Sequence, residues 1–127
     1  MLATEAHEQE TLVQWLRLKK IFHFAPVLEN NTHGQNRKWA MIAEVKAKKQ
    51  GKIKGTSDLF VFLDGKLLVI ELKRAKKLLK SGKYTTSHTN TSKEQKAFLE
   101  RVNKYPYAIG RVCFGWTEAK EFIEKYI

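Results

Sequence analysis

The sequence predicts an α/β fold, in which a small mixed β-sheet with a central hairpin is flanked by helices. Two apolar runs, Leu59–Leu63 and Leu67–Ile70, are separated by Asp64-Gly65, the dipeptide that best indicates a tight two-residue hairpin. Segments with helical periodicity alternate with the other apolar runs. The hairpin must be antiparallel, whereas a strand that follows a helix can join the sheet in parallel through a crossover.

The first predicted helix spans Thr4–Lys20, with Thr4 as its cap and Glu5 in the first turn, where the helix dipole favours a carboxylate. Its inner face is marked by Gln9, Leu12, Val13 and Leu16. The next segment, Ile21–Val27, is short, aromatic and apolar, and it contains Pro26. These features predict a strand at or near the edge of the sheet.

A polar loop is predicted at Glu29–Gln35, followed by a second helix at Arg37–Lys49. The dipeptide Gln50-Gly51 is a normal helix stop. The residues of this helix that are expected to face the core are Trp39, Ile42, Ala43 and Val45.

The hairpin is followed by a basic segment, Lys73–Lys83, and by a polar loop, Ser81–Thr91. A further helix begins at Ser92, because Ser92-x-x-Gln95 fits a capping box. Its apolar stripe is formed by Phe98, Leu99 and Val102.

The last two predicted elements are a strand at Tyr107–Phe114 and a helix that runs through Tyr126. Gly115 interrupts the strand, and Thr117 is the expected cap of the helix. The sequence contains no internal repeat, and we expect residues 1–127 to form a single domain.

The composition narrows the class of protein. With 127 residues, 43% of them hydrophobic, the chain is long enough to bury a core. No apolar run approaches the roughly 20 residues of a membrane span, and the acidic N-terminus does not resemble a secretory signal. The single cysteine, Cys113, lies in an apolar run and is expected to be buried, which suits a reducing cytoplasm. The four histidines are scattered without metal-ligand spacing, which argues against zinc.

The charge of the chain points to a polyanionic partner. The formal net charge of +11 favours nucleic acid first and anionic membrane second. No basic amphipathic helix with a clean apolar face is evident, so a membrane partner is not expected.

The hairpin brings together the residues that we expect to carry chemistry. If Asp64 and Gly65 are the two turn residues, Leu63 pairs with Lys66, and Asp58 falls directly opposite Glu71. Directly opposed residues hold their Cβ atoms roughly 4.5–5.5 Å apart, and like charges placed there are destabilising. A shared divalent cation would explain the pair. Lys73 follows on the same face of the strand, although a three-residue loop with a bulge would shift this register by one.

With these residues in place, the chain resembles the VRR-NUC family, small nucleases of the PD-(D/E)xK, restriction-endonuclease-like superfamily. The helix containing Glu5 and Gln9 resembles the family's opening helix with its motif glutamate. The stretch from Gln50-Gly51 to Asp58 resembles the glycine-rich approach to the motif aspartate. Glu71-Leu72-Lys73 matches the ExK element, and Gln95 matches the late glutamine. The family usually has proline before the aspartate, where this chain has Ser57.

The resemblance implies a restriction-endonuclease-like core and a role for each matching residue. Asp58, Glu71 and the backbone carbonyl of Leu72 would hold Mg²⁺ or Mn²⁺, hard cations that prefer oxygen ligands. Lys73 would orient or deprotonate the attacking water and stabilise the developing negative charge. Glu5 would reach the metal through a water molecule, with Glu8 as the alternative glutamate. Gln95 would hold the water or position Lys73.

Simpler interpretations stay open at this stage. Asp58, Glu71 and Lys73 could form a structural salt bridge, Gln95 could serve only its capping box, and Glu5 could be a solvated first-turn acid. Basic residues on both sides of the site could contact the phosphate backbone. The residues that we expect to do so are Lys52, Lys54, Arg74, Lys76, Lys77 and Lys80.

The function that this pattern favours is a metal-dependent, structure-selective DNA endonuclease. The resemblance extends to Holliday-junction resolvases that act as homodimers, and it suggests a role in DNA repair and an origin in a phage or mobile element. The loop Ser81–Thr91 could close over the substrate. The alternatives are a non-catalytic DNA-binding module with a nuclease-like fold and, more weakly, an RNA nuclease.

Overall fold

The structure, a computed structural model, describes residues 3–27, 37–76, 81–82 and 91–127. The predicted loop at Glu29–Gln35 and most of the loop at Ser81–Thr91 lie outside these residues. Within them, the predicted alternation of helices and strands is confirmed. In chain order the elements are α1 (Glu5–Leu18), β1 (His23–Phe24), α2 (Arg37–Lys49), β2 (Leu59–Leu63), β3 (Lys66–Lys73), α3 (Lys93–Val102), β4 (Ala108–Phe114) and α4 (Trp116–Glu124).

The sheet is mixed, as the sequence predicts. Its strand order is β1-β2-β3-β4, with β1/β2 and β2/β3 antiparallel and β3/β4 parallel. In the hairpin Leu63 pairs with Lys66 and Leu59 with Ile70, which confirms the two-residue turn. Gly65, the second turn residue, has φ of +69°, a left-handed conformation that glycine adopts without steric cost. The alternative register with a bulge is therefore wrong.

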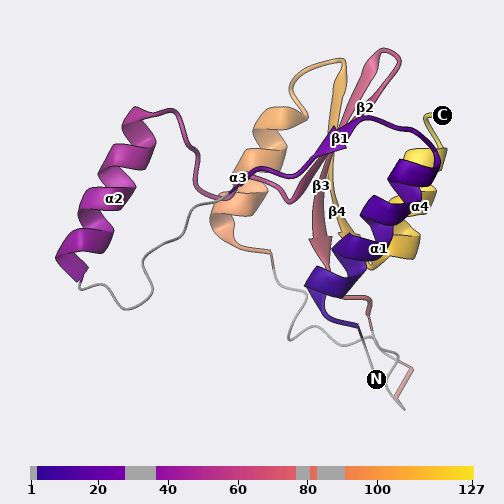
Figure 1. The fold of residues 1–127 in the computed structure, drawn as a ribbon, viewed down its shortest axis with the longest axis horizontal. Coiled ribbons are helices and arrows are strands. Elements are labelled where there is room, and N and C mark those ends of the chain that lie inside the picture. The colour runs from indigo at the N-terminus through magenta and orange to yellow at the C-terminus, as the bar shows by residue number, and fades with distance from the viewer. Residues whose placement is uncertain (1–2, 28–36, 77–80, 83–90) are drawn as a thin grey trace.

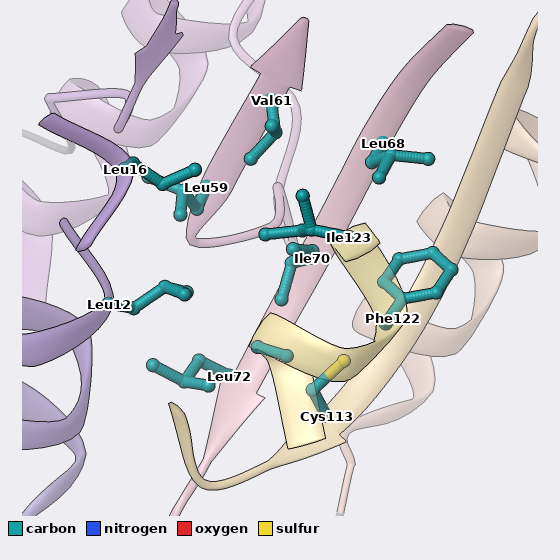
Figure 2. Packing of buried hydrophobic residues seen from close by; sticks show 11 residues of the cluster. Leu12, Leu16, Leu59, Val61, Leu68, Ile70, Leu72, Cys113, Phe122 and Ile123 are labelled. Carbon is teal, nitrogen blue, oxygen red and sulfur yellow. The ribbon is translucent and has the colours of Figure 1, made fainter. Parts of the chain in front are cut away.

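The hydrophobic core lies between one face of the sheet and the helix pair α1 and α4, which lie side by side (Figure 1). Figure 2 shows Leu12 of α1, Ile123 of α4 and Ile70 of β3 converging in this layer. Cys113 is buried in the same cluster, as predicted, and burial raises the pKa of its thiol to about 12. The thiol therefore stays protonated at neutral pH.

Helix α3 covers part of the opposite face of the sheet (Figure 1). It lies close to β4, as the glycine at position 110 shows. A Cβ atom at Gly110 would lie 2.9 Å from Leu99 Cδ2. Phe98 of α3 packs edge-to-face against Phe60 of β2, with ring centroids 6.3 Å apart. The other rings on this side, from Phe22, Phe24 and Phe62, are exposed to different degrees. This face is only partly covered by the described residues.

Two of the three predicted helix caps are confirmed. Thr4 caps α1 by accepting a hydrogen bond from His7 N, and Ser92 forms the predicted capping box with Gln95. Thr117 does not cap the last helix, which begins one residue earlier at Trp116. Instead, Glu8 Oε2 accepts a hydrogen bond of 2.5 Å from Trp116 N. Because Glu8 is so distant from Trp116 in the sequence, the residues around the start of α4 do not predict this cap.

Helix α2 forms over the predicted residues, but its predicted core-facing side is wrong. No residue of α2 is buried, and the side chains of Trp39, Ile42 and Val45 are 49–59% exposed. The helix stands apart from the other described elements, beyond α3 (Figure 1). Its amphipathic pattern shows that one face needs a cover, but the pattern does not show where that cover comes from. No helix among the described residues is long and apolar enough to cross a membrane.

Candidate active site

Three segments of the chain meet at the end of β3, on the side of the sheet that carries α3. They are the approach to β2 that ends in Asp58, the strand residues Glu71 and Lys73, and the first turn of α3 with Gln95. The hairpin register places Asp58 and Glu71 side by side, and the period of two places Glu71 and Lys73 on one face. The structure thus brings together these four predicted site residues.

Asp58 is fixed by its backbone neighbours. Its Oδ2 atom accepts a hydrogen bond of 2.8 Å from Leu72 N, at the point where the ladder between β2 and β3 ends. From α1, Gln9 Nε2 donates to the carbonyl oxygen of Asp58 at 3.5 Å. The aspartate is only partly buried, so the site is open to solvent on this side.

Gln95 connects Glu71 to Lys73. Its Nε2 donates to Glu71 Oε1 at 2.6 Å, and its Oε1 accepts from Lys73 Nζ at 3.2 Å. Lys73 Nζ also lies 3.6 Å from Glu71 Oε1. The same Gln95 Oε1 accepts from Ser92 N at 3.0 Å, which completes the capping box. Gln95 therefore both caps α3 and orders the candidate site, and the two interpretations of this residue are not exclusive.

The first turn of α3 is held against the approach to Asp58 by a glycine. Gly55 has φ of +85°, and a Cβ atom there would lie 2.5 Å from the backbone carbon of Glu94 and 2.8 Å from Gln95 N. A side chain at this position is therefore excluded both by the left-handed conformation and by the lack of space. This contact fixes the distance between the segment that carries Asp58 and the helix that carries Gln95.

The charge of Asp58 destabilises the charged form of Glu71. Burial, and then the negative charge of Asp58, raise the pKa of Glu71 from 4.5 to about 8. Burial also raises the pKa of Asp58, although its hydrogen bond from Leu72 N opposes the shift. The two side chains interact directly, so a protonated Glu71 can donate to Asp58. A cation could take the place of the proton that lies between the two carboxyl groups.

Glu71 also has an oxygen atom without a donor. The residue is 2% exposed, and its Oε2 accepts no hydrogen bond from the residues that the structure describes. A buried carboxylate oxygen without a partner costs free energy unless a cation or proton occupies it. Among the described residues no group of three or more His, Cys, Asp or Glu side chains could hold a metal ion. The carboxylates that meet here are thus the two of Asp58 and Glu71.

The two candidate glutamates of α1 lie in different surroundings. Glu5 is exposed in the first turn, and its side chain makes no hydrogen bond or ion pair with the other described residues. Gln9, one turn later, reaches Asp58. Glu8 is buried and is occupied by its hydrogen bond to Trp116 N at the start of α4. The geometry leaves Glu5 accessible and gives Glu8 a structural contact.

Ser57 is fully buried. It stands at the position where the family that the sequence resembles usually has proline. Its hydroxyl has no hydrogen-bond partner among the described residues. An unsatisfied hydroxyl of this kind costs about 1–3 kcal/mol. The departure affects stability rather than the site, because Ser57 touches none of the candidate ligands through its hydroxyl.

The basic residues predicted to contact DNA are only partly described. Lys52 and Lys54 are exposed on the approach to Asp58, and Lys54 lies 4.0 Å from Glu94 Oε1. Arg74 Nε donates to the carbonyl oxygen of Ala3, and Lys76 Nζ lies 4.2 Å from the centre of the Phe114 ring. Lys77 and Lys80 lie outside the described residues.

Comparison with known proteins supports the fold. No protein-family model and no curated protein matches the sequence. A solved structure described as "VRR_NUC domain protein" has a similar fold, with a TM-score of 0.69 and 18% sequence identity. The match covers 98% of this chain and 88% of that chain. The predicted resemblance to a VRR-NUC domain is thus confirmed for the fold.

Proposed function

We propose that this protein hydrolyses phosphodiester bonds in DNA with the help of Mg²⁺ or Mn²⁺. The observation that carries the proposal is the pair of carboxyl groups, in which the buried Glu71 has an oxygen, Oε2, without a donor among the described residues and the half-buried Asp58 lies beside it. Lys73 Nζ lies within 3.6 Å of the same carboxylate. An acidic pair beside a lysine, in a nuclease-like fold, fits phosphodiester hydrolysis better than a structural salt bridge.

The donor set fits a hard divalent cation. Mg²⁺ is often held by one or two carboxylates and keeps several waters, so two carboxylates and a carbonyl are sufficient. The third ligand would be the Leu72 carbonyl. A strand residue directs its N–H and C=O toward the same neighbour, and Leu72 N donates to Asp58. The cation would polarise the phosphate and offset the negative charge of the two carboxylates.

Lys73 and Gln95 would act on the phosphate side of the site. The Lys73 ammonium is oriented by Gln95 Oε1 and can donate to a phosphate oxygen on which negative charge develops. Gln95 is itself fixed by the start of α3, so it would position Lys73 without touching the substrate. Glu5, which is accessible, would contact the site through water. These assignments give Lys73 a catalytic role and Gln95 a positioning role.

The substrate in this proposal is branched or otherwise structured DNA. The exposed basic residues beside the site would contact phosphates, which are the same in every sequence. Recognition would then depend on the shape of the DNA. A pair of copies would present two sites to two strands, as resolution of a four-way junction requires.

The deciding experiment compares two DNA substrates with and without metal. A labelled four-way junction and a linear duplex of matching sequence are incubated with Mg²⁺, Mn²⁺ or a chelator. The variant is Lys73→Ala, and Lys125→Ala, an exposed residue after α4, is its control. We expect cleavage that needs metal, is faster on the junction, falls roughly 100-fold or more in Lys73→Ala and is unchanged in Lys125→Ala. Thermal unfolding of both variants in chelator shows whether the fold is retained.

Other outcomes select the alternatives. Equal DNA binding in chelator and in metal, with no cleavage of either substrate, would favour the non-catalytic DNA-binding module. Cleavage of a single-stranded or hairpin RNA but not of DNA would favour the RNA nuclease. Cleavage by Lys73→Ala at the wild-type rate would exclude the role proposed for this lysine.

A further inference from the structure

An apolar groove lies beside the candidate site, between α3 and the face of the sheet that α3 covers (Figure 1). Its volume of about 300 Å³ is at the lower end of the range for small-ligand sites. Its lining includes four aromatic side chains, those of Phe60, Phe98, Tyr105 and Tyr107. The two tyrosines are each 54% exposed, and their ring centres lie 5.7 Å apart. The groove therefore offers exposed rings that can stack with a planar ligand.

The aromatic lining continues as a row of rings across the sheet. Phe60 of the groove stacks with Phe24 of β1, with ring centres 5.0 Å apart and ring planes 5° apart. Phe62 lies 5.9 Å from Phe24, and Phe22 lies 5.1 Å from Phe62. The three rings outside the groove, from Phe22, Phe24 and Phe62, are 39–68% exposed and are called the aromatic row below. Exposed apolar surface of this extent indicates a place where a partner binds.

The charges around the groove favour an anionic ligand. Arg101 lines the groove, and Lys66 Nζ donates to the carbonyl oxygen of Pro106, the residue between the two tyrosines. Lys104 is exposed next to Tyr105. None of the lining residues that the structure describes is acidic. A nucleic acid strand with unpaired bases combines negative charge with planar rings whose faces are free to stack on aromatic side chains.

Two elements lead from the candidate site into the groove. On β3, Val69 lines the groove and lies on the same face as Glu71, two residues or about 6.6 Å away. On α3, Phe98 lines the groove three residues after Gln95, a spacing that places both on one side of the helix. A strand with a phosphate at the candidate site would thus reach the groove with a neighbouring base.

We propose that the groove binds an unpaired base of a DNA strand, which stacks on Tyr105 and Tyr107 while Arg101 and Lys66 contact the phosphates. The aromatic row receives further bases of the same strand. The inference rests on the proposed function and narrows its substrate to DNA with unpaired bases beside the cleaved bond, as in a flap, a gap or a splayed arm. The binding step itself requires no metal.

The first test measures binding in chelator by fluorescence anisotropy. One labelled strand consists of thymidines, and a second strand of the same length consists of abasic nucleotides, so the two carry the same phosphates and differ in their bases. We expect the wild type to bind the thymidine strand roughly tenfold or more tightly, because each stacked base contributes to affinity. Equal affinity for the two strands overturns the proposal.

Variants of exposed tyrosines then place the stacking in the groove. Tyr107→Ala removes a ring from the groove, and Tyr126→Ala, the control, removes an exposed ring beside α4 on the opposite side of the sheet. We expect Tyr107→Ala to bind the thymidine strand roughly tenfold more weakly and the abasic strand as the wild type does. Tyr107→Phe keeps the ring, so it and Tyr126→Ala should bind both strands normally. Tyr105→Ala repeats the test at the second ring, and wild-type binding by both groove variants to alanine overturns the proposal.

Sedimentation without DNA tests whether protein occupies the groove instead. We expect Tyr107→Ala to sediment at the same mass as the wild type, because a groove that binds DNA is empty without it. A lower mass for Tyr107→Ala would assign the groove to a contact between copies of the chain and overturn the proposal.

The two proposals fail separately, because binding is measured in chelator and cleavage with metal. With metal, we expect a duplex with an unpaired arm to be cleaved faster than a linear duplex, and Tyr107→Ala to reduce this preference. Binding that depends on bases and on Tyr107, with no cleavage of any DNA, would leave the groove assignment intact and contradict the nuclease. Cleavage by a protein that binds the thymidine and abasic strands equally would contradict the groove assignment and leave the nuclease intact.

Discussion

Glu71 combines the properties that the proposed metal ligand requires. It is almost fully buried, it faces a second carboxyl group, and one of its oxygens has no donor among the described residues. Its other oxygen is fixed by Gln95 and lies close to Lys73. In the metal-free protein a proton is the remaining means of neutralising it, which is why its pKa rises to about 8.

This shift predicts how stability depends on pH. The pKa of Glu71 is higher in the folded chain, at about 8, than its ordinary value of 4.5, so the folded state binds the proton more tightly. The stabilisation is complete below the ordinary value and is lost as the pH rises through about 8. The raised pKa of Asp58 acts in the same direction. We expect the metal-free protein to unfold at a lower temperature at pH 8 than at about pH 5.5.

The variant Glu71→Gln tests whether the Glu71 carboxyl group causes this pH dependence of stability. A glutamine can still accept from Gln95 but carries no charge, so we expect the pH slope to flatten and stability at pH 8 to rise by about 1 kcal/mol or more. Glu121→Gln, at an exposed site, is the control and should keep the slope. Thermal unfolding between pH 5 and about pH 8 provides the measurement. In addition, Mn²⁺ should stabilise the wild type and not Glu71→Gln; equal stabilisation of both would place the metal elsewhere.

At the scale of elements, the site depends on how a loop meets a helix. The hairpin alone places Asp58, Glu71 and Lys73, but Gln95 comes from α3, which is separated from β3 in the sequence. The contact that joins them is the close approach of Gly55 to the backbone of Glu94 and Gln95. Helix α4 is joined to α1 in a comparable way, through the hydrogen bond from Trp116 N to Glu8.

Gly55→Ala tests this contact, and Gly51→Ala is a matched control. Both glycines have nearly the same φ, +85° and +86°, but a Cβ atom at Gly51 would meet nothing within 4 Å. Each alanine costs about 1–2 kcal/mol for its left-handed conformation. Gly55→Ala should cost roughly 1–3 kcal/mol more, because backbone atoms must move. Denaturant unfolding measures the difference, and equal destabilisation would show that the close approach is unimportant. We also expect Gly55→Ala, but not Gly51→Ala, to reduce cleavage.

At the scale of the whole molecule, the net charge of +11 favours a polyanion before any specific contact forms. On the described surface, lysines lie on both the approach to the candidate site and the exposed helix α2. Phosphate contacts of this kind release counterions, so DNA binding should weaken steeply as salt is added.

Lysine variants can show which part of the surface causes the salt dependence of DNA binding. Lys54 has a side chain that is 70% exposed beside the candidate site, and Lys125 is exposed after α4. In chelator, we expect Lys54→Ala to weaken binding and to reduce the slope of log Kd against log salt by about 1. Lys125→Ala should leave the slope unchanged. A titration at several salt concentrations measures both, and identical slopes for the two variants would contradict the proposed DNA surface.

The sequence by itself determined the features that depend on local patterns. The alternation of helices and strands, the hairpin register and the capping box at Ser92 all follow from residues close together in the chain, and all three are confirmed. The register also placed Asp58 opposite Glu71, because strand geometry carries a two-residue turn along the whole ladder. Their roles with metal and DNA stay predictions.

Only the tertiary structure decided which faces are covered and which distant groups meet. The cap of α4 by Glu8, the double use of Gln95 and the contact of Gly55 with α3 all join segments far apart in the sequence. The apolar face of α2 was predicted to enter the core, yet the structure leaves it exposed. Hydrophobic periodicity reports that a face gains free energy by leaving water, and this gain is the same whether the cover is its own sheet or another chain.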